Sequence, residues 1–182
     1  GKVELDGKTL DPANPRETIR QGVAYVSGDR SREGVVTGRP ILENVMPIHY
    51  LRNRMILAHP AASASKALPA RQALRTKFAG LGFPISSLSG GNQQKVVIGR
   101  WLIDRPAVLL LDDPTKGIDL SAKADLFALI RKLAEEGMGI MLYASEDAEL
   151  LDNADRILVF NGGAIRRELT GADRTRYNLY QA

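Results

Sequence analysis

The chain has 182 residues, of which 44% are hydrophobic and 25% charged, a composition that fits one globular domain with a core. No apolar run approaches the roughly 18 residues of a membrane-spanning helix, the charged start argues against a signal peptide, and the lack of cysteine excludes disulfides and thiolate sites. The 25 basic and 21 acidic residues are scattered along the chain, so we expect no nucleic-acid partner.

The N-terminal part predicts a hairpin, a short helix and a strand. Alternating apolar residues at 3–5 run into an Asp-Gly pair, which is a favoured two-residue hairpin turn. Asn14 has the form of a helix cap, and Glu17 is placed to reach back to the cap amide. Gly22 ends this helix, and residues 23–26 predict a buried strand.

An inserted helical subdomain is predicted for residues 39–104, between the two core portions 1–38 and 105–182. Ala, Leu and Arg dominate this segment, and strand-like alternation is absent. His49 and His59 lie in it, far in sequence from any acid pair, so we expect both to be surface or packing residues. Trp101, near its end, is expected to lie in the core.

Strands and helices alternate after residue 105. Strands are predicted at 107–111 and 139–144, on either side of a helix at 121–136 whose apolar residues recur at helical spacing. A short acidic helix at 146–151 and a hairpin follow. This order predicts an α/β fold with a mostly parallel sheet.

A glycine pair before a helix gives the first chemical signal. Ser89, Gly90 and Gly91 precede a helical run that reaches Trp101. Such a start exposes backbone N–H groups at the positive end of a helix dipole, where an anion can bind. The same residues also allow a second interpretation, a flexible turn that caps a helix.

A pair of acids gives the second signal. Asp112 and Asp113 follow the apolar strand 108–111, and α/β sheets place ligands at the carboxyl ends of their strands. In nucleotide hydrolases an acid at this place holds Mg²⁺, largely through water. A solvated strand end is the alternative interpretation.

Together the two segments resemble the ABC transporter ATPase family, whose core is of the P-loop NTPase type. Residues 88–95 match the family's signature loop in a variant with Asn at the fifth position. Residues 109–112 match its Walker B strand, and residues 116–119 look like the loop that contacts the opposite domain. Residues 154–158 fit the stretch beyond the switch residue, so the resemblance covers nearly the whole chain.

The resemblance implies a role for each motif. ABC ATPase domains pair head to tail, and five signature residues would then bind the γ-phosphate of ATP held by the partner domain: Ser89, Gly90, Gly91, Asn92 and Gln93. Asp112 would hold Mg²⁺ through water, and Asp113 stands at the position of the acid that polarises the attacking water. Asp119 would belong to the cross-domain loop.

A further segment is similar to importers of monosaccharides. Residues 25–34 resemble the V-P-E-D-R-K-x-x-G run found in the second of two ATPase domains that these importers fuse in one chain. The resemblance implies a cargo such as ribose, xylose or galactose. It also implies a fused or paired ATPase domain, membrane permease subunits and, indirectly, a periplasmic sugar-binding protein, with the subunit peripheral at the cytoplasmic face of the inner membrane.

The phosphate-binding loop, Gly-x₄-Gly-Lys-Ser/Thr, does not occur in the sequence. Gly7-Lys8-Thr9 is preceded by Gly1 at the wrong spacing, and it lies in the predicted hairpin rather than between a strand and a helix. We therefore expect a partial ABC ATPase domain that lacks the phosphate-loop strand and helix, and that is inactive when isolated.

Three positions depart from the family's active pattern. Gly28 stands where a Gln or Glu would approach the magnesium and the attacking water. Asp113 replaces a Glu and loses one methylene, and a displacement of about 1 Å can cost on the order of 10²-fold in rate. Ser145 stands at the switch histidine and cannot carry its proton or charge at neutral pH.

These departures leave two hypotheses. In one, the chain is part of a working ATPase whose own site turns over slowly. In the other, which the departures favour, it is a non-hydrolysing half that completes the partner's site and transmits motion. A soluble ABC protein that acts on ribosomes or in DNA repair is disfavoured, because Asp29-Arg30 is of the sugar-importer type.

The missing strand has a consequence for the sheet. In the family it lies beside the strand predicted at 139–144, and unpaired buried backbone groups cost about 1–3 kcal/mol each. Without that strand, the sheet would have an empty slot beside residues 139–144. We expect this slot to close by rearrangement, to be filled by another copy of the chain, or to leave an exposed edge.

Overall fold

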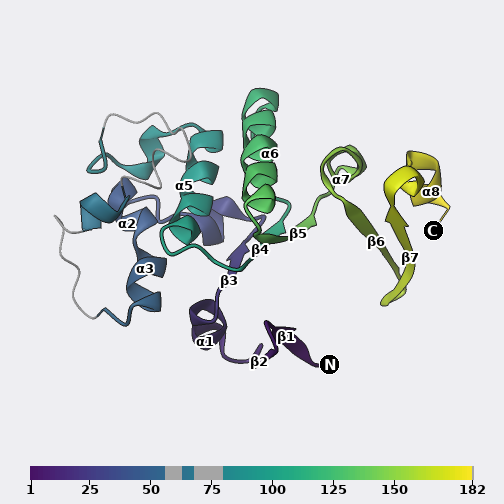
Figure 1. The fold of residues 1–182 in the computed structure, drawn as a ribbon. Coiled ribbons are helices and arrows are strands. Elements are labelled where there is room, and N and C mark those ends of the chain that lie inside the picture. Colours follow the sequence, from purple (N-terminus) through teal and green to yellow (C-terminus); the bar gives the residue numbers. More distant parts are fainter. Residues whose placement is uncertain (56–62, 68–79, 182) are drawn as a thin grey trace. The chain divides into compact units, whose positions relative to one another are not determined.

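The computed structural model describes residues 1–55, 63–67 and 80–181 (Figure 1). The chain divides into two compact units, Gly1–Met141 and Leu142–Ala182, and each is described by itself. The predicted α/β class is confirmed, because strands and helices alternate around a parallel pair of strands.

The first unit begins with a hairpin of β1 (Val3–Leu5) and β2 (Lys8–Leu10). Its turn has positive φ at Asp6 (50°) and Gly7 (74°), as a two-residue hairpin turn requires. The Gly7-Lys8-Thr9 sequence is therefore part of a hairpin, as predicted, and not a phosphate loop. Helix α1 (Pro15–Arg20) follows, and its cap Asn14 accepts a hydrogen bond from the backbone N–H of Glu17.

The side chain of Glu17 takes a different partner from the predicted one. We expected it to reach back to the cap amide, but its Oε2 lies 3.6 Å from Nη1 of Arg20, one turn further along α1. The two side chains are within reach at a spacing of three residues on a helix. Arg20 also donates to the carbonyl oxygen of Leu51, which connects α1 to a helix of the predicted insert.

The central sheet has the strand order β3-β4-β5, with β3 (Val23–Val26), β4 (Val108–Asp112) and β5 (Gly139–Tyr143). Strands β3 and β4 are parallel. The inward residues of these two strands are at most 2% exposed: Ala24, Val26, Leu109 and Leu111. Tyr25 on β3 is 48% exposed, so the prediction of a fully buried strand was wrong for one of its faces.

Strand β5 lies at the end of this order. Within the part of the chain that the structure describes, its sheet partner is β4 alone. Met141 and Tyr143 on β5 are 65% and 63% exposed. Among the described residues, one side of β5 therefore carries no neighbouring strand, and filling of the slot by another copy of the chain stays a prediction.

Short helices fill the segment between β3 and β4. A π-helical turn (Arg30–Gly34) follows β3, and α2 (Ile41–Val45) and α3 (Pro47–Arg52) come next. Residues 63–67 are helical, a 3₁₀ turn spans Ile85–Ser87, and α5 (Gly90–Leu102) leads to β4. Asn44, 1% exposed, bonds to Val36, Arg39 and Pro40 and so holds the loop that enters α2.

Helix α6 (Leu120–Glu135) follows β4 and matches the predicted helix within one residue at each end. Leu126, Ile130 and Leu133 bury its apolar face. Gly137, with φ of 88°, ends it as expected, because its backbone N–H bonds to the carbonyl of Ala134 in a left-handed cap.

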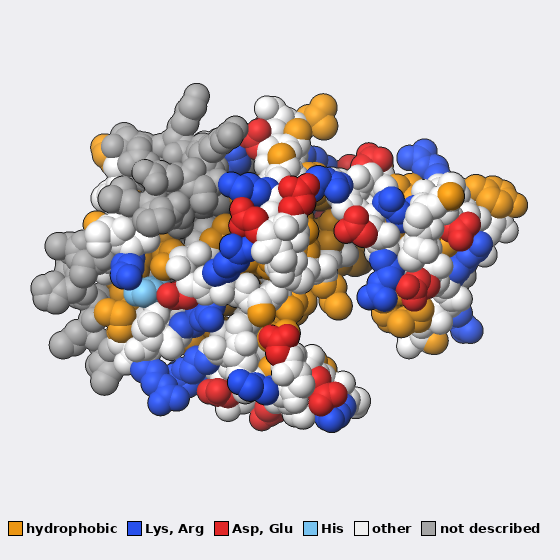
Figure 2. Space-filling model, viewed as in Figure 1, with side chains coloured by type: hydrophobic (Ala, Val, Ile, Leu, Met, Phe, Trp, Pro, Cys, Tyr) orange, Lys and Arg blue, Asp and Glu red, His pale blue; other side chains and the backbone are white. Residues whose placement is uncertain are grey.

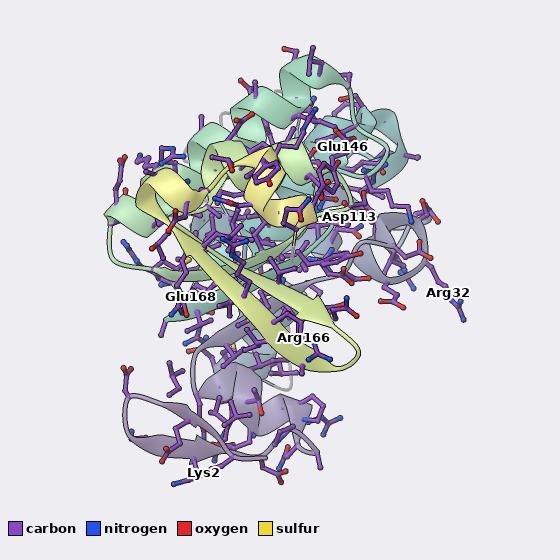
Figure 3. The ribbon with its side chains drawn as sticks, turned by 90° about the vertical axis from the view of Figure 1, so that its right-hand side faces the viewer. Lys2, Arg32, Asp113, Glu146, Arg166 and Glu168 are labelled. Atoms are coloured by element: carbon purple, nitrogen blue, oxygen red, sulfur yellow. The ribbon has the colours of Figure 1, made fainter. Side chains whose placement is uncertain are left out.

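The second unit contains a helix and a hairpin. Helix α7 spans Asp147–Asn153, and β6 (Arg156–Asn161) pairs antiparallel with β7 (Ala164–Thr170), as predicted. Arg166 and Glu168 project from β7 (Figure 3). A 3₁₀ turn (Gly171–Asp173) and α8 (Arg176–Tyr180) complete the unit, and the sequence had given no prediction for either.

The surface carries mixed charge. On the face shown in Figure 2, Lys and Arg side chains are interspersed with Asp and Glu, in line with the scattered charges of the sequence. Among the described helices, none combines the length and the apolar character that a membrane span requires.

Candidate functional site

The signature loop, residues 88–95, forms the start of helix α5. Ser89 is the N-cap in extended conformation, and its Oγ lies 3.4 Å from the backbone N–H of Asn92, which donates to it. Gln93 turns back and donates from Nε2 to the carbonyl oxygen of Leu88, at 2.9 Å. The remaining N–H groups of the first turn have no partner inside the helix, as at any helix start.

The two glycines are required by close packing. A methyl group at Gly91 would lie 2.5 Å from Cβ of Ala122 on α6, and one at Gly90 would lie 3.3 Å from the carbonyl oxygen of Gly117. Distances below 3.0 Å are not tolerated without movement, so α5 and α6 approach as closely as they do because Gly91 has no side chain. The glycine pair is therefore a packed helix start and not a loose turn.

Helix α5 is held over much of its length. Val96, Val97 and Ile98 are at most 3% exposed. Lys95, which is buried along its stem, places Nζ 2.8 Å from Oδ2 of Asp125 on α6. The first two turns of α5 are consequently fixed to α6, by the packing of Gly91 on Ala122 and by the ion pair of Lys95 with Asp125.

The acid pair lies at the carboxyl end of β4, as predicted. Asp112 is the last residue of the strand, and its Oδ2 accepts a hydrogen bond from the phenol of Tyr25 at 3.0 Å. Partial burial and the Asp112 carboxylate raise the pKa of Tyr25 above its usual 10.0. Asp113 has φ of 45°, a left-handed conformation that is uncommon outside glycine.

Gly28 lies directly against the acid pair. A methyl group at Gly28 would be 2.9 Å from the carbonyl oxygen of Asp112 and 3.4 Å from Cβ of Asp113. The backbone that leaves β3 therefore passes too close to the end of β4 to carry a side chain. The chain can approach the end of β4 this closely because Gly28 has no side chain.

Asp119 caps helix α6. Its side chain accepts a hydrogen bond from the backbone N–H of Ala122 at 2.9 Å, and Gly117, with φ of 70°, turns the chain before it. Ala122 is the residue that packs on Gly91. The loop after β4 thus sets the position of the α6 start against the signature loop.

Ser145 belongs to the second unit. It is exposed and lies between β5 and α7.

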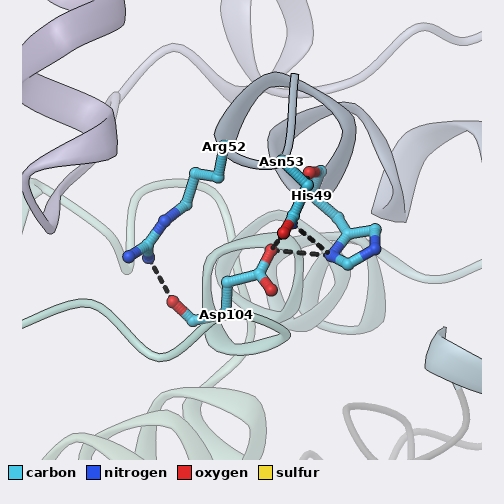
Figure 4. A network of polar contacts seen from close by, with 4 residues as sticks. All are labelled: His49, Arg52, Asn53 and Asp104. Carbon is cyan, nitrogen blue, oxygen red and sulfur yellow. Dashed lines mark hydrogen bonds and ion pairs between the residues drawn. The ribbon is translucent and has the colours of Figure 1, made fainter. Parts of the chain in front are cut away.

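His49, itself buried, forms a polar network with partly exposed residues that sequence reasoning missed (Figure 4). Its Nδ1 lies 2.7 Å from Oδ2 of Asp104, and Asn53 donates to the same carboxylate at 3.3 Å. Arg52 donates to the backbone carbonyl of Asp104. The packing role expected of His49 is confirmed, but its acid partner is 55 residues away in sequence and gave no local signal. Trp101 is 7% exposed, as predicted for the core, and His59 lies outside the described residues.

Two residues near the motifs were not expected to contribute. Tyr25 reaches Asp112 from the neighbouring strand, and Arg30 lies beside Gly90. Tyr25 lies near the carboxyl end of β3, which pairs parallel with β4, and residues near the carboxyl ends of adjacent strands meet. A prediction that these two strands are neighbours would have brought Tyr25 to the acid pair.

Comparison with known proteins identifies the family. Residues 1–116 match the family described as ABC transporter. The ribose import ATP-binding protein RbsA 3 of Rhizobium meliloti (strain 1021) is 39% identical over 181 residues, which are 98% of this chain and 36% of that protein. The xylose import ATP-binding protein XylG of Geobacillus kaustophilus (strain HTA426) is 38% identical, with coverage of 98% and 36%. The chain therefore spans about a third of the length of these curated relatives.

Solved structures agree with the fold. The ATP-binding cassette MJ0796, in a dimeric post-hydrolysis state bound to ADP and Pi, superposes with a TM-score of 0.76 at 22% identity, over 93% of this chain and 73% of that one. The ADP conformation of MJ1267, an ATP-binding cassette of an ABC transporter, gives 0.79 at 21% identity, over 99% and 73%. The chain has the fold of an ATP-binding cassette and belongs to the ABC transporter family.

Proposed function

We propose that this chain is part of the ATP-binding subunit of an ABC importer for a monosaccharide, and that ATP-driven closure of paired ATPase domains powers uptake. The observation that carries the proposal is the presence of two motifs in one compact unit of the chain. The Ser89-capped start of α5 offers N–H groups to an anion, and the acid pair ends β4. The names of the ribose and xylose import relatives support the class of cargo.

The signature loop serves the nucleotide of the paired domain. Ser89, Gly90 and Gly91 present the α5 start to the γ-phosphate of that ATP, with Asn92 and Gln93 in the same turn. Asp119 lies in the loop that faces the opposite domain. Its cap on α6 keeps that loop in register with the signature loop, because Ala122 packs on Gly91.

The acid pair serves the chain's own nucleotide. A carboxylate at Asp112 is a hard oxygen ligand of the kind that Mg²⁺ prefers. The described residues contain no group of three or more candidate metal ligands, so phosphates and water would complete the coordination sphere. Mg²⁺ would neutralise charge on the phosphates, while Tyr25 orients the Asp112 carboxylate.

The chain's own site is the weaker of the two sites. Asp113 has a shorter reach than Glu, Ser145 cannot carry the charge of a histidine, and Gly28 has no room for a side chain. Of the two hypotheses, a slow ATPase site or a non-hydrolysing half, the packing at Gly28 favours the second.

The insert, residues 39–104, docks on the membrane permease subunits in this proposal. The subunit is then peripheral at the cytoplasmic face of the membrane. A periplasmic sugar-binding protein acts on it only through the permeases.

The test uses the full-length subunit in a reconstituted transporter with its binding protein. A Ser89→Leu variant places a bulky side chain where the phosphate of the paired domain's ATP would bind. We expect it to lower ATP hydrolysis at least about tenfold, because loss of one transition-state donor costs about 10²–10³-fold in rate. A Ser145→Ala variant is the matched control, because it alters the site that is already weak. Equal losses, or a larger loss at Ser145, would refute the division of labour.

A further variant separates the two hypotheses. Asp113→Glu restores the length of the family's acid. If the site is slow but functional, hydrolysis rises in this variant. If the chain is a non-hydrolysing half, the rate stays unchanged, because Gly28 and Ser145 still lack their functional groups.

A further inference from the structure

We propose that Arg30 is an additional phosphate-binding residue of the signature loop. Its guanidinium supplies a positive charge beside Gly90 to the terminal phosphate of the nucleotide held by the paired domain. This inference rests on the proposed function, because it needs the signature loop to face that nucleotide. It adds a residue from the segment after β3 to a site otherwise built from the start of α5.

The turn that carries Arg30 is firmly placed. Asp29 caps it by accepting a hydrogen bond from the backbone N–H of Arg32 at 3.1 Å. At its other end Gly34 is buried, and a methyl group there would lie 3.2 Å from Cγ of Arg30 and 3.3 Å from Cγ2 of Val97. The aliphatic stem of Arg30 is thus packed along the turn, next to helix α5.

Arg100 fastens the same turn to α5. Its guanidinium donates to the carbonyl oxygen of Gly34, and burial lowers the pKa of Arg100. Helix α5 therefore holds the turn through Arg100. Gly90, the first residue of the same helix, lies next to the guanidinium of Arg30. The stem of Arg30 is therefore packed against a turn that α5 itself holds in place.

The guanidinium of Arg30 points to the helix start. A methyl group at Gly90 would lie 3.0 Å from Nη2 and 3.6 Å from Cζ of Arg30. Nη2 thus lies close to the first residue of α5, where the N–H groups of the helix start offer hydrogen bonds to an anion. An anion bound there would be within reach of both the backbone donors and the guanidinium.

The charge of Arg30 lacks a counter-ion. Nε and Nη1 are buried and have no hydrogen-bond partner, and among the described residues no carboxylate forms an ion pair with Arg30. A cation at the positive end of a helix is unfavourable, and unpaired buried donors add to this cost. The first of these costs is relieved when an anion binds beside Nη2 at the α5 start.

Phosphate fits this arrangement better than a carboxylate does. Nη2 can donate a charge-assisted hydrogen bond to one phosphate oxygen, and the terminal phosphate of ATP has further oxygens for the α5 start. Gly28 of the same segment contacts the acid pair, and Arg30 contacts the signature loop. Residues 28–30 therefore connect the chain's own nucleotide site to the site it shares with the partner.

The experiment replaces Arg30 in the full-length transporter. Arg30→Met keeps the packed stem and removes the charge, and Arg30→Lys keeps a charge. We expect Arg30→Met to raise the ATP concentration for half-maximal hydrolysis about tenfold, the effect of one lost charge-assisted hydrogen bond, and Arg30→Lys to recover part of the loss. Arg32→Met is the matched control, because Arg32 extends away from the same turn into solvent (Figure 3) and should change the value less than about twofold.

A second measurement tests a purely structural role. Chemical unfolding of the 182-residue chain should show Arg30→Met to be as stable as the wild type or more stable, because an uncompensated charge is removed. The inference is overturned if this variant loses stability, or if its ATP dependence equals that of Arg32→Met. If Ser89→Leu also leaves hydrolysis unchanged, the proposed function fails. If Ser89→Leu lowers hydrolysis and Arg30→Met does not raise the required ATP concentration, only the role of Arg30 fails.

Discussion

The phenol of Tyr25 donates a hydrogen bond to Oδ2 of Asp112 at 3.0 Å and so joins the ends of β3 and β4 at the acid pair. The bond fixes the orientation of the one carboxylate that the family resemblance assigns to Mg²⁺. It also disfavours ionisation of Tyr25, because a phenolate would place a second negative charge beside the Asp112 carboxylate.

A Tyr25→Phe variant should lose less than about 1 kcal/mol of stability near neutral pH, since the bond is half-exposed. Partial burial and Asp112 raise the pKa of Tyr25 in the folded state above 10.0. The folded state then binds the phenol proton more tightly than the unfolded state does. This stabilisation is complete below pH 10 and is lost as the pH rises through the folded-state pKa. Unfolding curves of both proteins across this range should converge, and parallel curves would contradict the assignment.

Replacing Gly91 should separate helices α5 and α6. In Gly91→Ala the new methyl group would meet Cβ of Ala122 at 2.5 Å, and we expect a loss of about 1–3 kcal/mol. Adding Ala122→Gly removes the clash at a helix-propensity cost of up to about 1 kcal/mol, so the double variant should recover most of the loss. Gly82→Ala is the control, because no described residue lies within 4 Å of a methyl group built there. Additive effects in the double variant would show that the two residues do not touch.

Restoring the family's acid at Gly28 should not restore activity. Gly28→Glu places Cβ 2.9 Å from the carbonyl oxygen of Asp112, and we expect a loss of about 1–3 kcal/mol in stability with no gain in hydrolysis. Gly38→Ala, in open space, is the control for the glycine change. A stable Gly28→Glu variant with faster hydrolysis would mean that the backbone beside β4 can move aside.

The network around His49 should be cooperative. His49→Ala and Asp104→Ala each leave a buried polar partner unsatisfied, and each should cost about 1–3 kcal/mol. Because both changes break the same contact, the double variant should lose less than the sum, by about 0.5–3 kcal/mol. Denaturant unfolding of the four proteins gives this coupling energy. A value near zero would show that the 2.7 Å contact contributes nothing to stability.

The 182-residue chain by itself should not bind ATP with micromolar affinity. It has no Gly-x₄-Gly-Lys-Ser/Thr sequence, and that loop supplies the backbone cradle and the lysine for the phosphates. Calorimetric titration with ATP and Mg²⁺ measures the affinity, with a cassette that carries the loop as the positive control. A micromolar dissociation constant for the chain would contradict this expectation.

The sequence alone determined the features that depend on neighbouring residues. Asn14 and Ser89 were recognisable as caps, and the Asp-Gly pair at 6–7 as a hairpin turn, because such signals act over a few residues. The acid pair could be placed at a strand end for the same reason, since the apolar run 108–111 stops where the carboxylates begin. The family followed from these local motifs in their order along the chain.

Only the tertiary structure decided which distant residues meet. His49 and Asp104, Gly91 and Ala122, and Arg30 and Gly90 are brought together by helix packing, which no local pattern encodes. The same holds for Gly28, because only the structure shows that a methyl group there would lie 2.9 Å from the carbonyl oxygen of Asp112. Local hydrogen bonding and turn geometry are properties of short segments, whereas contact distances depend on how closely whole elements approach, and that distance is set by the smallest residues between them.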